Sequence, residues 1–480
     1  MATKKKVLLI ATNTEKKPYP VPPIGLGIVA QSIREHYDVK VYDAMFDEGR
    51  SLPTVVNSFR PDYIGCSIRN VDSMSVEAPD FFLEAIAEKI IRPLKKITDV
   101  PIILGGSGYS IYPYEMLDYF DLDYGIAGEG ETAFAQLLDC LQKNSDFGST
   151  KGIIYRKSPG FEKKTKNHAP HPGQTFFSGI ENFIDFNPYK ERGAYSIQSK
   201  RGCAHHCIYC TYPLIEGHTF RTRSVADIVD EIEQVAAKLG DVFFEFVDST
   251  FNDPAGHAEA ICTEIIRRGL KVRIRTMGIN PANTSKNLFN LMMQAGFTQI
   301  DSTPDSASPA MLKNLGKNFS LPQLQKMALQ IKGSGLPTMW FFVFGGPGET
   351  RTTIDETFEF IRDYISPEDM VYITTSLRIY PGTKLYKTAL KEHLITPEQS
   401  LLNPVFYSST QFSSEELHDY LRQKIGKSHN LLFSSEAKPS AEMMQEAIYA
   451  RKQHNLTEPM FRTLLRIRKR LMDEGKIMAP

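Results

Sequence analysis

The sequence SKRGCAHHCIYC, residues 199–210, places three cysteines within eight positions, at Cys203, Cys207 and Cys210. Three thiolates with this spacing on one loop can each bind a different iron of a cubane cluster, which leaves the fourth iron without a protein ligand. An open coordination position is typical of a catalytic metal site rather than a structural one. A zinc site completed by one of the two intervening histidines is the alternative, but the chain lacks the second cysteine pair or spaced histidine pair of structural zinc sites. The spacing therefore predicts a [4Fe–4S] cluster.

Strand and helix patterns alternate around this stretch, over residues 195–390. Short runs rich in β-branched and aromatic residues are followed by amphipathic helical patterns. The clearest helix covers Ala226–Lys238, with Ser224 as its N-cap. Six strand–helix units predict a partial (β/α)6 barrel rather than the full eightfold one. The strands are expected at Tyr195–Ser199, Phe243–Asp248, Val272–Thr276, Gln299–Ser302, Thr338–Phe344 and Tyr372–Ile379.

Residues 1–145 show the same alternation and predict an α/β domain with a doubly wound, Rossmann-like parallel sheet. Ligands of such sheets bind beyond the carboxyl ends of the strands, where this sequence has glycine-rich segments. Helices are expected at Ile24–Glu35, Pro79–Lys95 and Glu131–Leu141, and strands at Val7–Ala11, Val39–Asp43, Tyr63–Ser67, Ile102–Leu104 and Tyr124–Ala127.

Two further segments depart from this alternation. Residues 146–194 are rich in Gly, Pro, Lys and Ser and are expected to form a linker, with a hairpin near Gly152–Lys157. Residues 391–480 predict a C-terminal helical region that closes the mouth of the barrel. Its helices are expected at Ser414–Ile425, Ala441–Gln453 and Pro459–Met472.

The composition is that of an ordinary globular chain, with 41% hydrophobic and 23% charged residues. Its 56 basic and 56 acidic residues give no net charge, which argues against nucleic-acid or anionic-membrane binding through bulk electrostatics. There is no apolar run of about 18 residues and no N-terminal signal-peptide pattern. Six cysteines are too few for a disulfide scaffold. We therefore expect a cytoplasmic protein without nucleic-acid or membrane partners.

The cysteine motif resembles that of the radical S-adenosylmethionine (SAM) superfamily, whose signature is Cys-x3-Cys-x-aromatic-Cys. Tyr209 supplies the aromatic residue, and Ala204 stands where many relatives have proline. The resemblance implies that the open iron chelates the amino and carboxylate groups of SAM. One-electron cleavage of SAM then gives a 5′-deoxyadenosyl radical, which abstracts a hydrogen from the substrate.

Four later segments resemble the SAM-binding segments of the superfamily and follow in the same order. They are the acidic end of the second strand, the ribose-binding segment after the fourth, the glycine-rich end of the fifth and the end of the sixth. Asp305 stands where glutamate is common and could instead cap a helix, and glycines also end strands for structural reasons alone. The SAM contacts implied by the resemblance are Tyr209, Asp248, Asp305, Gly345, Gly346 and Arg378.

The N-terminal domain resembles the cobalamin-binding domain that precedes many radical SAM barrels. The likeness rests on Pro22–Gly27, Ile103–Ser107 and Gly128–Glu131. An inherited domain that binds nothing is the alternative, and a dinucleotide site is disfavoured because no complete Gly-x-Gly-x-x-Gly follows the first strand. The cobalamin contacts implied are Arg69, Gly105, Gly106, Ser107, Gly128 and Glu129.

A histidine below the cobalt is not expected. The Asp-x-His-x-x-Gly motif of cobalamin-dependent mutases is absent, and His36, on the first helix, is the only histidine in the first 150 residues. Arg69, after the third strand, is the candidate for the lower face of the corrin. A surface or salt-bridging role is the alternative for this arginine.

These resemblances imply a cobalamin-dependent radical SAM methyltransferase that moves a methyl group from SAM, by way of methylcobalamin, to an unactivated carbon or similar centre. The alternative is an enzyme with the same cofactors that performs other redox or cyclisation chemistry. A methylthiotransferase would need three further N-terminal cysteines, whereas only Cys66 and Cys140 lie there, and a SPASM-type enzyme would need cysteines after Cys262. A non-enzymatic iron–sulfur protein would have no use for the SAM-like segments. We expect a small-molecule or peptide substrate and an external reductant of the flavodoxin or ferredoxin type.

Overall fold

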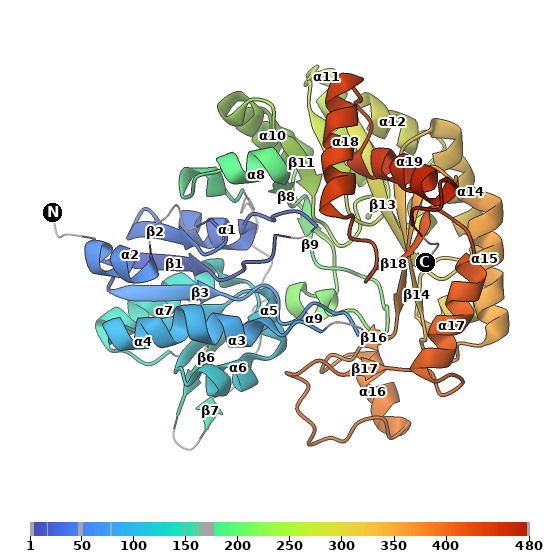
Figure 1. Ribbon diagram of the computed structural model, residues 1–480. Helices are drawn as coiled ribbons and strands as arrows, with labels where there is room; N and C mark the ends of the chain where they lie inside the picture. The colour runs from blue at the N-terminus through green and yellow to red at the C-terminus, as the bar shows by residue number, and fades with distance from the viewer. Residues whose placement is uncertain are drawn as a thin grey trace.

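The computed structural model describes the chain except residues 1–3, 17, 47–50, 77–78, 148–149, 158–159, 163–176 and 478–480. It contains two large seven-stranded sheets, each packed against helices. Figure 1 shows the N-terminal sheet, in blue and cyan, beside a second sheet that is wrapped by green, yellow and orange helices. In the described part of the chain, no helix is both long enough and apolar enough to cross a membrane.

The N-terminal sheet consists of β1 (Lys6–Ala11), β2 (Asp38–Asp43), β3 (Tyr63–Ser67), β4 (Ile102–Gly105), β5 (Tyr124–Ile126), β6 (Ile153–Arg156) and β7 (Phe161–Glu162). Their order is β2-β1-β3-β4-β5-β6-β7, and the first five are parallel. The winding direction reverses between β1 and β3, and ligands of such sheets bind at that reversal, beyond the carboxyl ends of the strands. The predicted doubly wound sheet is confirmed.

Helices cover both faces of this sheet. They are α1 (Ile24–Ile33), α2 (Leu52–Phe59), α3 (Phe82–Ile86), the π-helical turn η1 (Ala87–Ile91), α4 (Arg92–Ile97), α5 (Ser107–Ile111), α6 (Pro113–Phe120) and α7 (Gly130–Lys143). Helices α1 and α7 pack together on one face, and α2, α3, α4 and α6 cover the other. Because α3, η1 and α4 are continuous, they form the single helix that the sequence predicts near Pro79–Lys95.

The segment predicted as a linker, residues 146–194, is partly built into the sheet. Strand β6 pairs antiparallel with β5, and β7 pairs antiparallel with β6, so the sheet continues past residue 145. The hairpin expected near Gly152–Lys157 is present. Further along lie the 3-10 turn η2 (Ile180–Asn182) and α8 (Asn187–Arg192), whereas residues 163–176 are outside the described residues.

The second sheet consists of β8 (Tyr195–Ile197), β11 (Phe243–Phe246), β12 (Arg273–Thr276), β13 (Phe297–Asp305), β14 (Thr338–Phe344), β15 (Met370–Thr375) and β18 (Leu431–Phe433). All neighbours are parallel, in the order β18-β15-β14-β13-β12-β11-β8, so the barrel stays open between β18 and β8. The first six strands in chain order match the six predicted. Strand β18 was missed because three residues are too few to show a period.

The helices around the barrel follow its strands in chain order. They are α9 (Tyr212–Glu216), α10 (Val225–Leu239), α11 (His257–Arg267), the turn η3 (Pro281–Asn283), α12 (Leu288–Gln294), α13 (Pro309–Asn314), α14 (Leu321–Ser334), α15 (Arg351–Tyr364) and α16 (Lys384–Lys391). Ser224 caps α10 as predicted, since its Oγ accepts the N–H of Asp227.

Two short ribbons complete this region: β9 (Lys200–Arg201) with β10 (Arg221–Thr222), and β16 (Leu377–Arg378) with β17 (Phe406–Tyr407). The predicted sixth strand, Tyr372–Ile379, is therefore broken. Ser376 separates β15 from β16 and has a left-handed φ of 67°.

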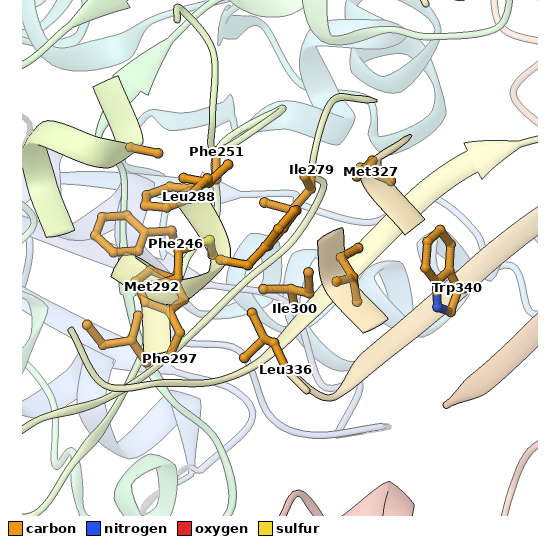
Figure 2. Close-up of a cluster of buried hydrophobic side chains, with 14 of the residues drawn as sticks. Phe246, Phe251, Ile279, Leu288, Met292, Phe297, Ile300, Met327, Leu336 and Trp340 are labelled. Carbon is orange, nitrogen blue, oxygen red and sulfur yellow. The ribbon is translucent and has the colours of Figure 1, made fainter. Parts of the chain in front are cut away.

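The two faces of the barrel wall differ in burial. On β14, Trp340, Phe342 and Phe344 are buried against helices, whereas Met339 and Phe341 on the other face keep part of their exposure. This period of two is that of a strand. Figure 2 shows the outer layer, where aromatic and aliphatic side chains of several strands and helices meet.

The C-terminal helices α17 (Ser414–Ile425), α18 (Ala441–Gln453) and α19 (Met460–Asp473) match their predicted positions. Their predicted place over the mouth of the barrel is wrong for α19. Arg462 Nη2 lies 3.0 Å from Asp369 Oδ1, and Asp369 immediately precedes β15. Phe461 and Leu465 pack beside Met370, the first residue of that strand. Helix α19 thus covers the amino-terminal end, the floor, and leaves the carboxyl end to face the N-terminal domain.

Candidate active site

The three clustered cysteines lie on the loop between β9 and α9, just beyond the carboxyl end of β8. Backbone hydrogen bonds attach this loop to three separate parts of the barrel. They run from Cys203 N to Gly217 O (3.1 Å), from Ile208 N to Leu315 O (3.0 Å) and from Leu385 N to Ile208 O (2.8 Å). The loop therefore has a defined shape at the mouth of the barrel.

The thiols on this loop are close enough to influence one another. Burial raises the pKa of Cys203, Cys207 and Cys210, to about 12 for Cys210, and negative charge on the other two thiols raises that of Cys210 further. Such thiols stay protonated at neutral pH unless bound cations stabilise the thiolates. Three adjacent thiols on one loop fit the donor set of a cubane cluster.

A buried cation stands beside these thiols. Lys317 Nζ lies 2.8 Å from Asp305 Oδ2 and 3.2 Å from the carbonyl oxygen of Thr303. Its charge opposes the burial effect at Cys207 and favours a thiolate there. Tyr209 donates a second hydrogen bond to Asp305, which has a left-handed φ of 65°. Sequence reasoning missed Lys317, which has no motif of its own.

Asp253 fixes the histidine that follows Cys203 by two positions. His205 Nε2 lies 2.7 Å from Asp253 Oδ2, which Thr250 Oγ1 (2.7 Å) and Asn280 Nδ2 (2.8 Å) also approach. Burial raises the pKa of Asp253, but these hydrogen bonds outweigh it and leave a value of about 2. A permanent carboxylate therefore orients His205 inside the cysteine loop.

The glycine-rich segment after β14 adjoins the same loop. Gly345 has a φ of +86°, and a Cβ on Gly346 would lie 3.2 Å from both Leu315 and Met311. Side chains at these positions would be strained or crowded, which accounts for both glycines. Glu349 follows, and burial raises the pKa of its carboxyl to about 7.

A cavity of about 550 Å³ lies between the N-terminal sheet and the mouth of the barrel. The N-terminal domain contributes the carboxyl ends of β1, β3 and β4, and the barrel contributes residues of β8, α9 and the segment after β11. A second hollow of about 360 Å³ shares Thr12, Asn13 and Asn70 with it. All six residues expected to contact cobalamin line the larger cavity: Arg69, Gly105, Gly106, Ser107, Gly128 and Glu129.

Glycine is required for this shape at two neighbouring positions, for different reasons. Gly106 has a φ of +99°, and a Cβ there would lie 2.5 Å from the carbonyl oxygen of Ile68. The nearest atom to a Cβ on Gly105 would be the Ile126 oxygen at 3.9 Å, so a side chain there would project into open space. The cavity thus includes room that any larger residue would occupy, which fits a large ligand such as a corrin.

Comparisons with known proteins agree with this arrangement. The model of the radical SAM superfamily matches residues 197–361, and that of the B12-binding domain matches residues 11–138. The chain is a radical SAM protein with a B12-binding domain. Its cofactors are therefore a [4Fe–4S] cluster, SAM and cobalamin.

Three similar proteins match this chain over most of its length. An uncharacterized methyltransferase of Pyrococcus horikoshii is 26% identical, over 87% of this chain and 91% of the relative. The tryptophan 2-C-methyltransferase of Streptomyces laurentii is 24% identical, over 70% of this chain and 67% of the relative. The solved structure of the radical SAM methyltransferase TsrM from Kitasatospora setae, with cobalamin and a [4Fe–4S] cluster bound, superposes with a TM-score of 0.82. It is 21% identical and covers 99% of both chains.

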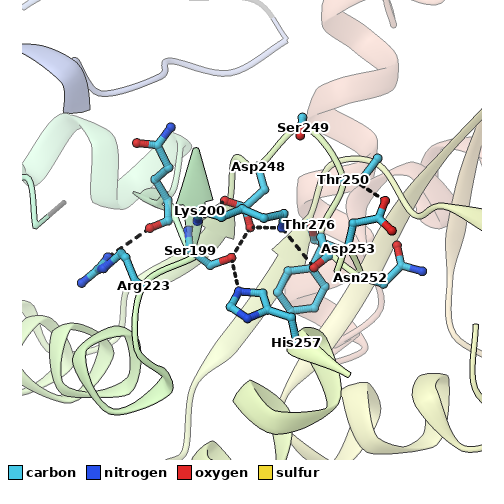
Figure 3. A network of polar contacts seen from close by, with 12 residues as sticks. Ser199, Lys200, Arg223, Asp248, Ser249, Thr250, Asn252, Asp253, His257 and Thr276 are labelled. Atoms are coloured by element: carbon cyan, nitrogen blue, oxygen red, sulfur yellow. Dashed lines mark hydrogen bonds and ion pairs between the residues drawn. The ribbon is translucent and has the colours of Figure 1, made fainter. Parts of the chain in front are cut away.

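Asp248 has several protein partners within the radical SAM barrel. Figure 3 shows it in a buried network. Its Oδ1 accepts the N–H groups of Ser199 (2.8 Å) and Lys200 (3.3 Å), and its Oδ2 accepts Ser199 Oγ (2.5 Å) and Lys200 Nζ (3.2 Å). His257 Nε2 lies 2.9 Å from the same Ser199 Oγ, and burial lowers its pKa to about 4. Asp248 therefore stabilises the segment before the cysteine loop, and its expected SAM contact stays a prediction.

Arg378 also has several protein partners. Its Nε lies 3.1 Å from Asp72 Oδ2, and its remaining nitrogens donate to the carbonyl oxygens of Ile379, Val405 and Leu401. The side chain is 3% exposed. An arginine used in this way joins the radical SAM barrel to the B12-binding domain. The expected SAM contact stays a prediction, and the structure shows Arg378 held by these protein partners.

Glu129 lines the 550 Å³ cavity, but its carboxylate has protein partners. Arg201 Nη1 lies 3.2 Å from Oε2, and Arg221 pairs with both oxygens. Both arginines belong to the β9–β10 ribbon of the barrel. Glu129 thus ties the two domains together beside the cavity, and a ligand there would meet its backbone rather than a free carboxylate.

Proposed function

We propose that this protein is a cobalamin-dependent radical SAM methyltransferase acting on a small molecule. The observation that carries the proposal is that the cysteine loop and the 550 Å³ cavity meet in one short segment. Cys210 ends the cysteine loop, and Tyr212, two residues later, lines the 550 Å³ cavity and is within electrostatic range of Cys210. Adjacent sites allow one substrate to meet both cofactors.

In this proposal each cofactor has its own set of residues. Cys203, Cys207 and Cys210 hold the cluster, and Asp305 with Lys317 supports the SAM ribose side of the loop. Gly345 and Gly346 let the backbone approach SAM. The cobalamin contacts come from Arg69, Gly105, Gly106, Ser107 and Gly128. Tyr209 belongs to the cluster and SAM side, where it packs at the base of the cysteine loop and donates to Asp305.

The protein would supply orientation and exclusion of water, whereas the cofactors supply one-electron chemistry and a transferable methyl group. Asp248, Asp253 and Arg378 would act through the shape of the site, because their carboxylates and guanidinium already have protein partners. The methyltransferase names of the relatives support this reaction class over other cobalamin-linked redox chemistry. An external reductant of the flavodoxin or ferredoxin type would deliver the electron.

The test is anaerobic incubation of the protein, loaded with iron, sulfide and cobalamin, with SAM whose methyl group carries deuterium. A reduced flavodoxin supplies electrons, and small-molecule fractions supply the substrate. We expect a labelled product and S-adenosylhomocysteine, both lost in Cys207→Ala. SAM cleavage to 5′-deoxyadenosine without any labelled product in every fraction would contradict methyl transfer.

A further inference from the structure

A polar cluster lies on the inner wall of the barrel, apart from the cysteine loop. Glu245 on β11, Arg275 on β12 and Asp301 on β13 point inward, because their neighbours Phe246, Ile274 and Ile300 belong to the outer core. Glu245 and Arg275 are direct neighbours across the strands. The two carboxyl groups and the guanidinium therefore take no part in packing the strands against the outer helices.

The N-terminal domain reaches into this cluster through one side chain. Tyr19, on the loop after β1, donates to Glu245 Oε1 at 2.7 Å, and the same oxygen accepts Arg275 Nε at 2.8 Å. The guanidinium carbon of Arg275 lies 3.8 Å from the centre of the Tyr19 ring. Arg275 is therefore held in one orientation before any ligand arrives.

Two buried atoms of this cluster have no hydrogen-bond partner among the described residues. They are Arg275 Nη2, a donor, and Asp301 Oδ1, an acceptor. A buried polar group without a partner costs about 1–3 kcal/mol, so native proteins rarely keep two of them in one cluster without a use. Ser196 Oγ on β8, next to Glu245 across the strands, also has no hydrogen-bond partner among the described residues. Ser196 lines the 550 Å³ cavity as well.

The inner wall next to Asp301, on β14 and β15, is apolar. Phe341 on β14 and Tyr372 on β15 stack at 5.0 Å between ring centres with planes 7° apart, and Met339 lies on the same face. Met339 and Tyr372 pack in part against Phe461 and Leu465 of α19, but Met339, Phe341 and Tyr372 all keep part of their exposure although their strands are central. Part of the space before them is therefore open, above the floor that α19 forms.

We infer that this interior binds the substrate, and that the substrate is a zwitterionic small molecule with an apolar side chain, such as an amino acid. Arg275 Nη2 binds its carboxylate and Asp301 Oδ1 binds its ammonium group, while Phe341 and Tyr372 contact the side chain. The inference rests on the proposed function, because methyl transfer needs a substrate site within the barrel that carries the cysteine loop. Arg275 and Asp301 are the specificity-determining residues.

The test measures binding to the cluster- and cobalamin-loaded protein with SAM present, by calorimetry. The probes are the common apolar and aromatic L-amino acids, each with its matched amine lacking the carboxylate and its matched acid lacking the amine. We expect at least one amino acid to bind, and its amine and acid to bind at least about tenfold more weakly, because each leaves one buried charge unpaired.

Matched variants then assign the two ends. Arg275→Met and Asp301→Asn should each lower the affinity for the amino acid at least about tenfold and leave the affinities for SAM and cobalamin unchanged. Arg273→Met and Asp241→Asn are the controls, since Arg273 lies on the same strand and face but pairs at the surface with Asp241. These two should change nothing.

Several outcomes would overturn the inference. One is that no amino acid binds, and another is that the matched amine or acid binds as tightly as the amino acid. A third is that the two variants lower the affinity for SAM and not the affinity for the amino acid. Methyl transfer is scored separately with labelled SAM. Amino-acid binding without methyl transfer would therefore remove the proposed function alone, and methyl transfer without amino-acid binding would remove this inference alone.

Discussion

The Nε atom of Arg378 lies 3.1 Å from Oδ2 of Asp72, and this buried ion pair connects the radical SAM barrel to the B12-binding domain. Replacing Asp72 with Asn leaves the guanidinium buried without its counter-charge, which costs about 3–5 kcal/mol. We expect a large fall in the urea concentration at the unfolding midpoint. Asp241→Asn, which breaks an exposed pair, is the control and should change stability by less than about 0.5 kcal/mol. An Asp72 variant as stable as this control would contradict the role of the pair.

The cysteine loop should hold one cluster. Cys203→Ala, Cys207→Ala and Cys210→Ala should each remove the cluster absorbance and SAM cleavage, with about four irons per chain in the parent protein. Cys66→Ala, Cys140→Ala and Cys262→Ala are matched controls and should keep the iron. A reproducible content near eight irons per chain would mean that a second cluster exists.

Gly105→Leu should abolish cobalamin binding without unfolding the protein. A side chain at this position projects into the cavity and meets no atom closer than 3.9 Å at its Cβ, so it fills ligand space rather than distorting β4. The visible spectrum after gel filtration measures how much cobalamin stays bound. A variant that keeps its cobalamin would contradict this prediction. Gly333→Leu on α14 also meets open space but lies far from the cavity, and it should bind cobalamin like the parent.

Bound cob(II)alamin should carry no protein histidine below the cobalt. His36 follows α1 and precedes β2, at the amino end of the sheet, whereas the cavity lies at the carboxyl end and Arg69 lines it. A guanidinium stays protonated and has no lone pair for the metal. Electron paramagnetic resonance should show a spectrum that His36→Ala leaves unchanged and Arg69→Ala alters. Nitrogen splitting that disappears in His36→Ala would refute this.

Glu349 should make the folded state less stable as the pH rises. Burial raises its pKa from 4.5 to about 7, so between these values the folded protein binds more protons than the unfolded chain. Stability therefore falls through this window, by up to about 3 kcal/mol from this group. Glu349→Gln removes the titration, so its stability relative to the parent should increase from pH 4.5 to pH 7, as measured by urea unfolding at each pH. A constant difference would show that the carboxyl is not perturbed.

Several predicted site residues have protein partners that the sequence did not indicate. Asp248, Glu129 and Arg378 stand where cofactor contacts were expected, yet each has protein partners that saturate it. A position at a strand end predicts that a side chain lies near a ligand site. It does not show whether another part of the protein already binds that side chain. Lys317 and Tyr19 were missed for the same reason, because their importance comes from what they contact.

The sequence by itself determined the cluster loop, the six barrel strands and the cobalamin-side glycines, because these are local patterns of spacing, alternation and backbone freedom. Only the tertiary structure decided how the two domains meet and what fills the barrel. Asp72 and Arg378 are 306 residues apart, and Tyr19 and Glu245 are 226 apart. Pairing over such separations depends on how both sheets pack, which no short stretch of the chain encodes.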